Sequence, residues 1–328
     1  TSMIYLGTVE TDDDLYGCLK YDIQPQIADF CEEPCYHVWR LNGSNDVFLY
    51  EERQTGARIV GKFFEDVRRL EREYGNLVKV RSYGFDEEPF YVAAPLGKNE
   101  NLSNFLAVEY CTGELLGDII TRAIADKDET LLYGKLSALA HFFAELHNRT
   151  AIDVPADFNE ACEYMNRVIE QDESLLTDGE ADVLYALRDE WRDKSEMGED
   201  CQVLIHGDAT PANFIFGDFD AVKTFDLERC QYADRASDIG RMAGELKHFF
   251  MSAKEDGLAA EPFINHFLRE YASRFPDAEA AFNAVTKRVP FYMGTTLLRI
   301  GRNFWIDRDY RRRLIDEAEK CLQGGLPA

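Results

Sequence analysis

The hydrophobic pattern of this chain changes near residue 113, and that change constrains the fold more than any other feature. Before it, the short β-prone runs 36–41, 47–50 and 58–64 are separated by polar turns, which is the pattern of antiparallel strands. After it, apolar residues recur at helical spacing, first over 131–147. The sequence therefore predicts an α+β fold with two lobes, a β-rich N-terminal lobe and a mostly helical C-terminal lobe.

We expect the 328 residues to divide into an N-terminal extension over 1–35, a β-rich lobe over 36–112 and a helical lobe over 113–328. Two large units agree with the length, because one domain commonly holds about 150 residues. The first lobe should contain one helix, over 66–79, and the second should contain charged helical sequence over 158–197.

Proline punctuates the C-terminal part of the chain. From residue 236 onward the pattern is helical, and Pro262, Pro276 and Pro290 interrupt it. Because proline lacks a backbone N–H and clashes with the preceding turn of a helix, we expect a helix break near each of them.

The charge of the chain excludes several classes of function. There are 36 Lys and Arg against 61 Asp and Glu, a net charge of −25. Such a surface repels phosphate backbones and anionic lipid, so neither a nucleic-acid binder nor a membrane-surface binder is expected.

No stretch reaches the roughly 18 apolar residues of a spanning helix, and no signal segment opens the chain. The eight cysteines form no CxxC pair, which favours reduced thiols and a cytoplasmic protein.

One stretch carries the chemistry of the chain. It runs from Leu204 to Phe216, with His206, Gly207 and Asp208 after one apolar strand and Asn213 before the next; Asp226 then follows a hairpin. Phosphoryl transfer needs a carboxylate that positions and deprotonates a hydroxyl, and oxygen ligands that hold Mg²⁺ on the phosphates. Asp208 suits the first task, and Asn213 and Asp226 suit the second. Each residue alone would be a turn or cap residue; the set favours catalysis.

At these residues the chain resembles a known family. His206-Gly-Asp-Ala-Thr-Pro-Ala-Asn213 resembles the catalytic loop of the aminoglycoside phosphotransferase and choline kinase family, and Phe225-Asp-Leu-Glu228 resembles its metal-binding motif. Asp234-Arg-Ala-Ser-Asp238-Ile is similar to the family's DPxxDLA stretch, and Ala144-Glu-Leu-His147 resembles one of its helix ends. The resemblance extends from about residue 36 to 250.

The resemblance implies a protein-kinase-like fold and an ATP- and Mg²⁺-dependent transfer of phosphate to a hydroxyl of a small molecule. It implies catalytic roles for His206 and Asp208. It also implies that Asp238 braces the catalytic loop.

The N-terminal lobe holds candidate nucleotide-binding residues. Asn42-Gly43-Ser44-Asn45 resembles the family's nucleotide loop, although a plain hairpin turn would have the same composition. Lys62 lies inside an apolar strand, where pairing with nucleotide phosphates would explain its charge; the alternative is an edge-strand lysine that faces water. A helix glutamate should hold this lysine. Glu71 and Glu73 are both candidates, and the family spacing favours Glu73.

The segment from Leu106 to Gly113 is interpreted as the hinge between the lobes. In this interpretation the backbone of Val108, Glu109, Tyr110 and Cys111 would bond to adenine. The same segment is also, more simply, a strand that leaves the first lobe.

The charge of the acceptor is left open by the sequence. Residues 152–200 carry 16 acidic and 4 basic side chains, which would attract a cationic acceptor such as an amino sugar or amino alcohol. A solvated acidic face is the simpler interpretation, and we favour it. A cationic acceptor could be faced by Glu228, Asp234 and Glu245. An anionic acceptor could instead be reached by Arg299 and Arg302.

Two alternatives to a small-molecule kinase fit the sequence less well. A protein kinase is disfavoured, because Gly207 stands where a basic residue is expected between His206 and Asp208, and no GxGxxG loop or APE-like segment is found. A non-catalytic nucleotide-binding regulatory module is disfavoured, because such a module need not keep Lys62, Asp208, Asn213 and Asp226 together. Nothing in the sequence indicates an oligomeric state.

Overall fold

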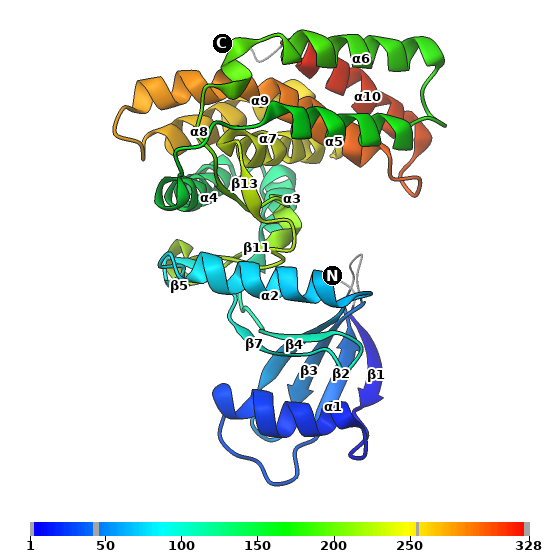
Figure 1. Ribbon diagram of the computed structural model, residues 1–328, viewed down its shortest axis with the longest axis vertical. Helices are drawn as coiled ribbons and strands as arrows, with labels where there is room; N and C mark the ends of the chain where they lie inside the picture. Colours follow the sequence, from blue (N-terminus) through cyan, green and yellow to red (C-terminus); the bar gives the residue numbers. More distant parts are fainter. Residues whose placement is uncertain (1–2, 42–45, 254–255, 325–328) are drawn as a thin grey trace. The chain divides into compact units, whose positions relative to one another are not determined.

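The computed structural model describes residues 3–41, 46–253 and 256–324 (Figure 1). The chain folds as two compact units. The β-rich unit comprises Thr1–Gly113 and Gly217–Glu228, and the helical unit comprises Glu114–Phe216 and Arg229–Ala328. A β-rich part and a helical part confirm the predicted α+β fold class.

The β-rich unit is built on a six-stranded antiparallel sheet in the order β1-β2-β3-β4-β8-β7. These strands are β1 (Ile4–Thr8), β2 (Tyr36–Arg40), β3 (Asp46–Glu52), β4 (Arg58–Phe63), β7 (Pro95–Asn99) and β8 (Phe105–Glu109). Edge strand β1 comes from the segment 1–35 that the sequence leaves as an extension. The short strand β6 (Phe90–Val92) pairs antiparallel with β5 (Asp86–Glu87) and parallel with β12 (Val222–Thr224).

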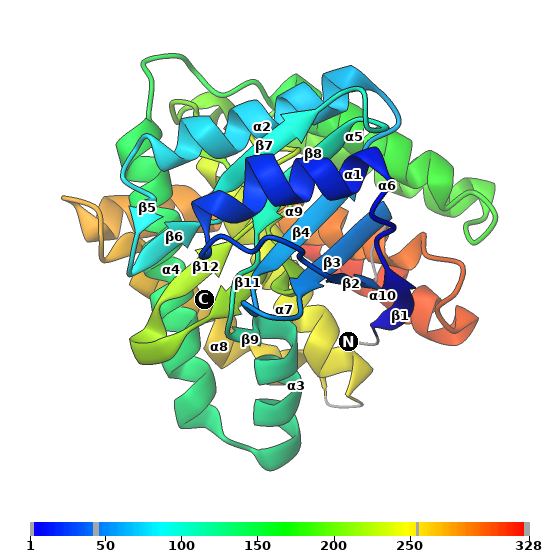
Figure 2. The same cartoon turned by 90° about the horizontal axis from the view of Figure 1, so that it is seen from below.

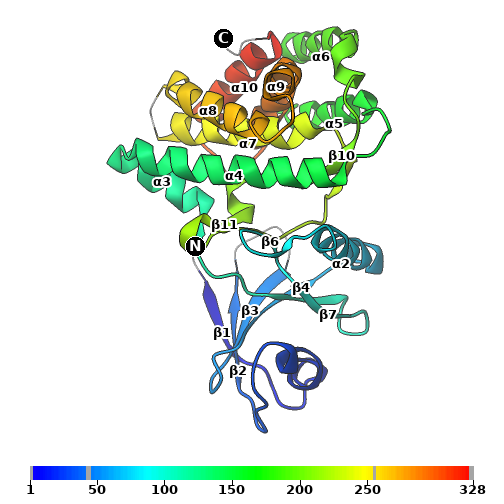
Figure 3. The ribbon, with the colours of Figure 1, turned by 90° about the vertical axis from the view of Figure 1, so that its left-hand side faces the viewer.

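A helical segment covers one face of this sheet. Helix α1 (Asp14–Gly17) continues as a π-helical stretch, Cys18–Ile23. Figure 2 shows it crossing strands β3 and β4, and Figure 3 shows it end-on, in dark blue, beside the strands. The apolar side chains of this segment and of the sheet form one buried cluster, because each of the two elements has an apolar face that must be shielded from water. The cluster contains Leu19, Ile23, Tyr36, Tyr50, Ile59, Phe105 and Ala107.

Three residues separate the end of β4 from helix α2 (Val67–Arg81). Asp66 caps it, since the Asp66 side chain accepts a hydrogen bond from Arg69 N at 2.9 Å. Its buried residues are Leu70, Glu73, Leu77 and Val80, which recur at helical spacing. A glutamate therefore occupies one position of an otherwise apolar face.

The helical unit contains eight α-helices within the described residues. They are α3 (Leu116–Asp126), α4 (Glu129–Thr150), α5 (Phe158–Gln171), α6 (Asp178–Arg192), α7 (Arg235–Ser252), α8 (Glu261–Ala272), α9 (Ala278–Gly301) and α10 (Arg308–Leu322). Figure 3 shows α4 running along one side of the unit, next to α7 and α8. Two strand pairs complete the unit: β10 (Val203–Ile205) with β13 (Gln231–Ala233), and β11 (Phe214–Phe216) with β9 (Glu114–Leu115). None of the helices in the described ranges is long and apolar enough to cross a membrane.

The expected helix break at Pro290 is wrong, because α9 runs through it from Ala278 to Gly301. A proline inside a helix costs about 3 kcal/mol. Burying one large apolar side chain contributes about 1.5–3 kcal/mol, and α9 buries several around this point, among them Val289, Phe291 and Leu297. Tertiary packing therefore outweighs the local cost.

Two glycines let α7 and α9 pack closely. A Cβ on Gly240 would lie 2.4 Å from Tyr292 Cβ, and one on Gly244 would lie 2.9 Å from Thr296 Cβ. Both distances are shorter than van der Waals contact, so no larger residue fits without moving a helix.

We expect Gly240→Ala to lower the free energy of unfolding by about 2–3 kcal/mol, because overpacking forces the helices apart. Gly134→Ala, in α4, is the matched control. A Cβ there meets nothing within 4 Å, so the better helix propensity of alanine should leave stability unchanged or raise it by up to about 1 kcal/mol. Urea unfolding of both variants measures the difference, and equal effects would contradict the packing argument.

Residues 158–197 are mostly helical, as the sequence predicts, and form the two helices α5 and α6. Helix α5 ends at Gln171, and α6 begins after Thr177, which forms a capping box with Glu180. Asp172 ends α5 and is fully buried, and neither of its carboxylate oxygens has a hydrogen-bond partner among the described residues. Burial raises the pKa of Asp172 to about 7, although Arg311 and Arg302 oppose the shift.

We therefore expect the contribution of Asp172 to stability to fall as pH rises from about 4 to about 7. The unfolded chain loses the Asp172 proton near pH 3.9, whereas the folded chain keeps it until about pH 7, so the folded state binds more protons in between. Asp172→Asn should raise the free energy of unfolding at pH 8 by on the order of 2 kcal/mol and change it little at pH 4. The exposed neighbour variant Glu173→Gln is the control. If both variants keep the wild-type dependence of unfolding on pH, Asp172 is not the group responsible.

Candidate active site

In the β-rich unit, Lys62 joins two acidic side chains. It lies in β4 and is buried, and its Nζ donates to Glu73 Oε1 of α2 at 2.6 Å. The same Nζ forms an ion pair with Asp226, 164 residues away in the sequence. Burial lowers the pKa of Lys62, but the charges of Asp226 and Glu73 outweigh it and the net pKa is raised. The lysine is therefore a fixed positive charge.

The glutamate that contacts Lys62 is Glu73, the one favoured by the sequence. Glu71, the other candidate, is half-exposed and pairs with Lys98 of β7. The two glutamates lie on different faces of α2 because they are two residues apart in a helix.

Asp226 follows β12 in a constrained backbone. Its φ is +60°, a left-handed conformation that Asp and Asn tolerate better than most residues. Helix α2 holds the residues that come next, since Asn76 Nδ2 donates to Leu227 O at 2.7 Å and Arg69 Nε donates to Glu228 at 2.7 Å. One helix therefore positions both Glu73 and the segment that contains Asp226. Glu228, a candidate acceptor residue, is engaged by Arg69.

The predicted hinge lies at the end of β8. Val108 is paired with Val60 of β4 and with Pro95 of β7, so it belongs to the interior of the sheet. The Glu109 carboxylate accepts from Ala94 N at 2.7 Å. Tyr110 and Cys111 follow the strand, and burial raises the pKa of the Cys111 thiol to about 12. The predicted nucleotide loop, Asn42, Gly43, Ser44 and Asn45, lies outside the described residues.

In the helical unit, the loop between β10 and β11 holds Asp208 and Asn213 together. Asn213 Nδ2 donates to Asp208 O at 2.8 Å and to Asp208 Oδ2 at 3.0 Å. The two residues are five apart, and the short 3₁₀ turn Pro211–Asn213 brings them side by side. About a quarter of the Asp208 side chain is exposed.

Asp238 braces this loop from the first turn of α7. Its Oδ2 accepts from His206 N at 2.8 Å and its Oδ1 from Gly207 N at 3.1 Å. His147 of α4 lies 2.9 Å from Oδ2 and is itself hydrogen-bonded to Tyr271. Burial raises the pKa of Asp238, but the His147 contact and the other hydrogen bonds outweigh burial, and the net pKa is lowered. The carboxylate is therefore ionised in the interior, with its charge balanced by donors.

The local backbone explains why Gly207 separates His206 from Asp208. Gly207 has a φ of +83°, and a Cβ there would lie 2.1 Å from Arg229 O. Only glycine fits. The His206 ring is fully buried, packs on Phe214 with ring centroids 5.2 Å apart, and has its Nδ1 3.2 Å from Asp208 N.

Two arginines reach Asp208, and the sequence identified one of them. Arg299 Nη2 lies 3.6 Å from Asp208 Oδ1, and Arg241 Nη2 lies 2.8 Å from the same oxygen. Arg241 Nη1 also donates to Gly207 O at 2.9 Å. Burial raises the pKa of Asp208, but Arg241 and Arg299 outweigh it and the net pKa is lowered. Arg241 could have been found from its place three residues after Asp238, on the same face of a helix.

Two other acceptor candidates have structural partners. Asp234 is the buried N-cap of α7 and accepts two hydrogen bonds from Arg288, Nε to Oδ2 at 2.8 Å and Nη2 to Oδ1 at 2.9 Å. Arg302 Nη1 donates to Gln171 at 2.6 Å. Part of the acidic segment 152–200 is likewise paired, since Asp200 contacts Arg235 and Arg288.

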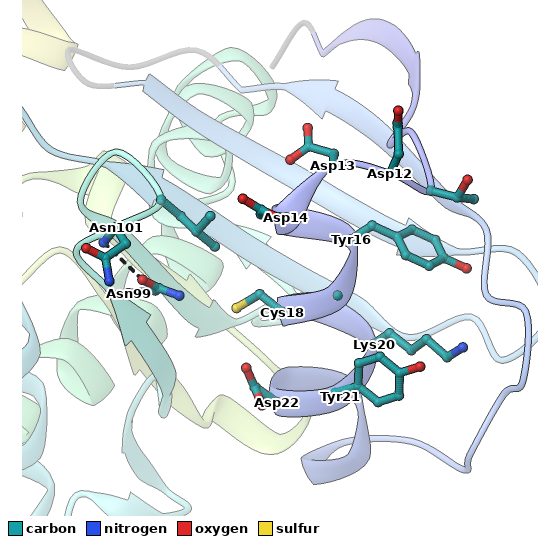
Figure 4. A pocket seen from close by; sticks show the side chains of 13 residues that line it. Asp12, Asp13, Asp14, Tyr16, Cys18, Lys20, Tyr21, Asp22, Asn99 and Asn101 are labelled. Atoms are coloured by element: carbon teal, nitrogen blue, oxygen red, sulfur yellow. Dashed lines mark hydrogen bonds between the residues drawn. The ribbon is translucent and has the colours of Figure 1, made fainter.

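A separate depression of about 530 Å³ lies beside α1 and the turn after β7. Figure 4 shows Asp14, Cys18 and Asp22 on the side that faces Asn99 and Asn101. None of the predicted site residues lines it. Across the described ranges, no group of three or more His, Cys, Asp or Glu side chains could hold a metal ion.

The sequence matches the model of the phosphotransferase enzyme family over residues 40–276. The chain belongs to this family. The match covers the β-rich lobe from the end of β2 onward and the catalytic loop, and it confirms the resemblance found in the sequence motifs. The comparison with curated proteins finds no match.

Solved structures of similar fold include other phosphotransferases. A ternary complex of APH(2")-IIa with streptomycin and ATP has a TM-score of 0.58 at 14% identity, covering 96% of this chain and 99% of that one. An ethanolamine kinase from Plasmodium vivax has a TM-score of 0.56 at 15% identity, covering 87% and 81%. The choline kinase LicA from Streptococcus pneumoniae has a TM-score of 0.56 at 15% identity, covering 95% and 100%. At these identities the likeness establishes the protein-kinase-like fold.

Proposed function

We propose that this protein transfers the γ-phosphoryl group of ATP to a hydroxyl of a small molecule. The observation that carries the proposal is the buried Lys62, held between Glu73 and Asp226. A buried lysine with two carboxylate partners is costly to desolvate, and a phosphate-binding role explains why the chain keeps it. Family membership supports the reaction class.

The reaction assigns a role to each residue. Asp208 orients the acceptor hydroxyl and takes its proton, while the hydroxyl oxygen bonds to the γ-phosphorus and ADP leaves with the bridging oxygen. Lys62 contacts the α- and β-phosphates, and Glu73 positions Lys62. Asp238 and His206 position the catalytic loop.

Mg²⁺ fits the donors that the chain offers. Asp226 is a partly exposed carboxylate, and Asn213 turns its amide nitrogen to Asp208, so its oxygen is the atom suited to a metal. Hard oxygen donors with water and phosphate as the remaining ligands are the set that Mg²⁺ prefers. The ion would neutralise charge on the transferred group.

The two parts of the chain would then act as the lobes of a kinase. The nucleotide loop 42–45 and the hinge residues Val108, Glu109, Tyr110 and Cys111 would bind the nucleotide. Because Val108 is already paired on both sides in the sheet, Tyr110 and Cys111 are the better candidates for adenine contacts.

A coupled ADP-release screen tests the function. Wild-type protein with MgATP should release ADP at a rate that depends on one class among sugars, amino sugars, amino alcohols, hydroxy acids and nucleosides. Repeating the active reaction with GTP measures nucleotide preference. If calorimetry detects MgATP binding while no acceptor across the panel supports turnover, the non-catalytic nucleotide-binding alternative is favoured instead.

A further inference from the structure

Two arginine side chains converge on Asp208 from different helices. Arg241 of α7 places Nη2 2.8 Å from Asp208 Oδ1, and Arg299 of α9 places Nη2 3.6 Å from the same oxygen. Only 12% and 19% of the two side chains are exposed. Burying two like charges side by side is unfavourable unless anions compensate them, and one carboxylate compensates one charge.

Several buried polar atoms of this cluster have no hydrogen-bond partner within the described part of the chain. They are Arg241 Nε, Arg299 Nε and the Tyr164 hydroxyl. Arg241 Nη2 and Asp208 Oδ1 form no hydrogen bond of good geometry but face each other as an ion pair at 2.8 Å. Tyr164 belongs to α5 and interacts electrostatically with Arg299. Buried donors without partners are rare in native proteins and commonly mark a place that a ligand completes. Here donors outnumber acceptors, so the missing group is an acceptor of hydrogen bonds.

The charges around the cluster indicate that this group is an anion. Arg229 also acts on Asp208, and Arg302 acts on Arg299. Opposite these four arginines, of which Arg229 is exposed, stand Asp208, the buried Glu245 and, beside Arg302, Asp172, whose burial raises its pKa to about 7. Burial raises the pKa of Glu245, although Arg241 and Arg299 oppose the shift. This local excess of positive charge occurs in a chain whose net charge is −25, so it is not a consequence of composition.

We propose that the phosphate acceptor carries an anionic group, a carboxylate or a phosphate, which Arg241 and Arg299 bind beside the hydroxyl that Asp208 orients. The proposal rests on the proposed phosphotransfer and names its substrate class. A guanidinium binds either anion through two parallel hydrogen bonds. An anion that engages the arginines also reduces their hold on Asp208 Oδ1, which frees that carboxylate to accept the hydroxyl proton.

A different use of the arginines is to stabilise the transferred phosphoryl group itself, as arginine residues do in other phosphotransferases. The two uses differ in kinetics. If the arginines contact the acceptor, removing one raises the acceptor KM by an amount that depends on the charge of the acceptor. If they contact the phosphoryl group, removing one lowers kcat for every acceptor.

The test uses the full chain with MgATP and two acceptor sets that each share one carbon skeleton. The first contains glycerate, glycerol 3-phosphate, glycerol and 3-amino-1,2-propanediol; the second contains glucuronate, glucose 6-phosphate, glucose and glucosamine. We expect kcat/KM for a carboxylate or phosphate member to exceed that of its neutral and amino counterparts about tenfold or more. The carboxylate and phosphate members separate the two anions.

Arg299→Gln should raise the KM of the preferred acceptor about tenfold or more while the KM for ATP stays nearly unchanged. Arg299→Lys should restore part of the loss, because it keeps the charge and loses the planar fork. Arg188→Gln is the matched control, since Arg188 of α6 has 15% of its side chain exposed and pairs with Asn166 and Asp189. It should leave the acceptor KM unchanged.

Three results would overturn the proposal: neutral or amino acceptors that react as well as anionic ones, an acceptor KM that Arg299→Gln leaves unchanged, or an equal loss of kcat for all acceptors. If wild-type protein turns over no acceptor, the proposed function fails, and thermal unfolding in sodium sulfate against sodium chloride at equal ionic strength decides the anion site separately. Stabilisation by sulfate in wild type and in Arg188→Gln, lost in Arg299→Gln, supports the site. No difference between these proteins removes it.

Discussion

Asp208→Asn should lower kcat about 10³-fold, the scale of a lost general base, while the Kd for MgATP changes by less than about threefold. Asn keeps the shape of the side chain and loses its ability to take a proton. Asp208 is braced within the helical unit by Asn213, whereas Lys62, Glu73 and Asp226 belong to the other unit, so nucleotide affinity should survive. Steady-state kinetics and calorimetry measure the two effects.

The exposed variant Asp153→Asn, in the same unit, is the control and should behave as wild type. A parallel loss of MgATP affinity and turnover in Asp208→Asn would show that Asp208 serves the nucleotide instead of the acceptor. The pH profile gives a second readout. Arg241 and Arg299 overcome the effect of burial and lower the pKa of Asp208, so kcat/KM, which reports the free enzyme, should persist as pH falls below the usual pKa range of an aspartate.

Asp226→Asn should raise the Mg²⁺ concentration needed for half-maximal activity about tenfold or more, because a carboxylate ligand is replaced by a neutral amide. Lys62 would lose one of its two carboxylate partners and keep Glu73, so the fold should remain intact while the affinity for MgATP falls. A Mg²⁺ titration at saturating ATP and acceptor, with circular dichroism to check folding, measures this.

Asp218→Asn is the matched control for Asp226→Asn, since Asp218 is an exposed aspartate of the same β-rich segment 217–228. It should give the wild-type titration. If Asp226→Asn gives that curve too, Asp226 is not a metal ligand, and its contact with Lys62 would be its whole function.

Patterns close together in the sequence could be interpreted without the structure. The strands around Lys62, the helix that follows it and the loop from His206 to Asn213 depend on neighbouring residues, whose turn chemistry and apolar spacing specify local structure. Even there, packing decided the details. Pro290 lies inside α9 because burial outweighs its local cost, and β1 joins the sheet because a distant strand offers it a pairing edge.

The sequence by itself determined the fold class, the family and the residue types needed for phosphoryl transfer, because these depend on composition, periodicity and short motifs. Only the tertiary structure decided which side chains meet. It brought Glu73 instead of Glu71 to Lys62 because the two glutamates lie on different faces of α2. It brought Arg241 and Arg299 to one oxygen of Asp208 because Gly240 and Gly244 let α7 approach α9. Contacts of this kind join residues far apart in the chain, and no local pattern records them.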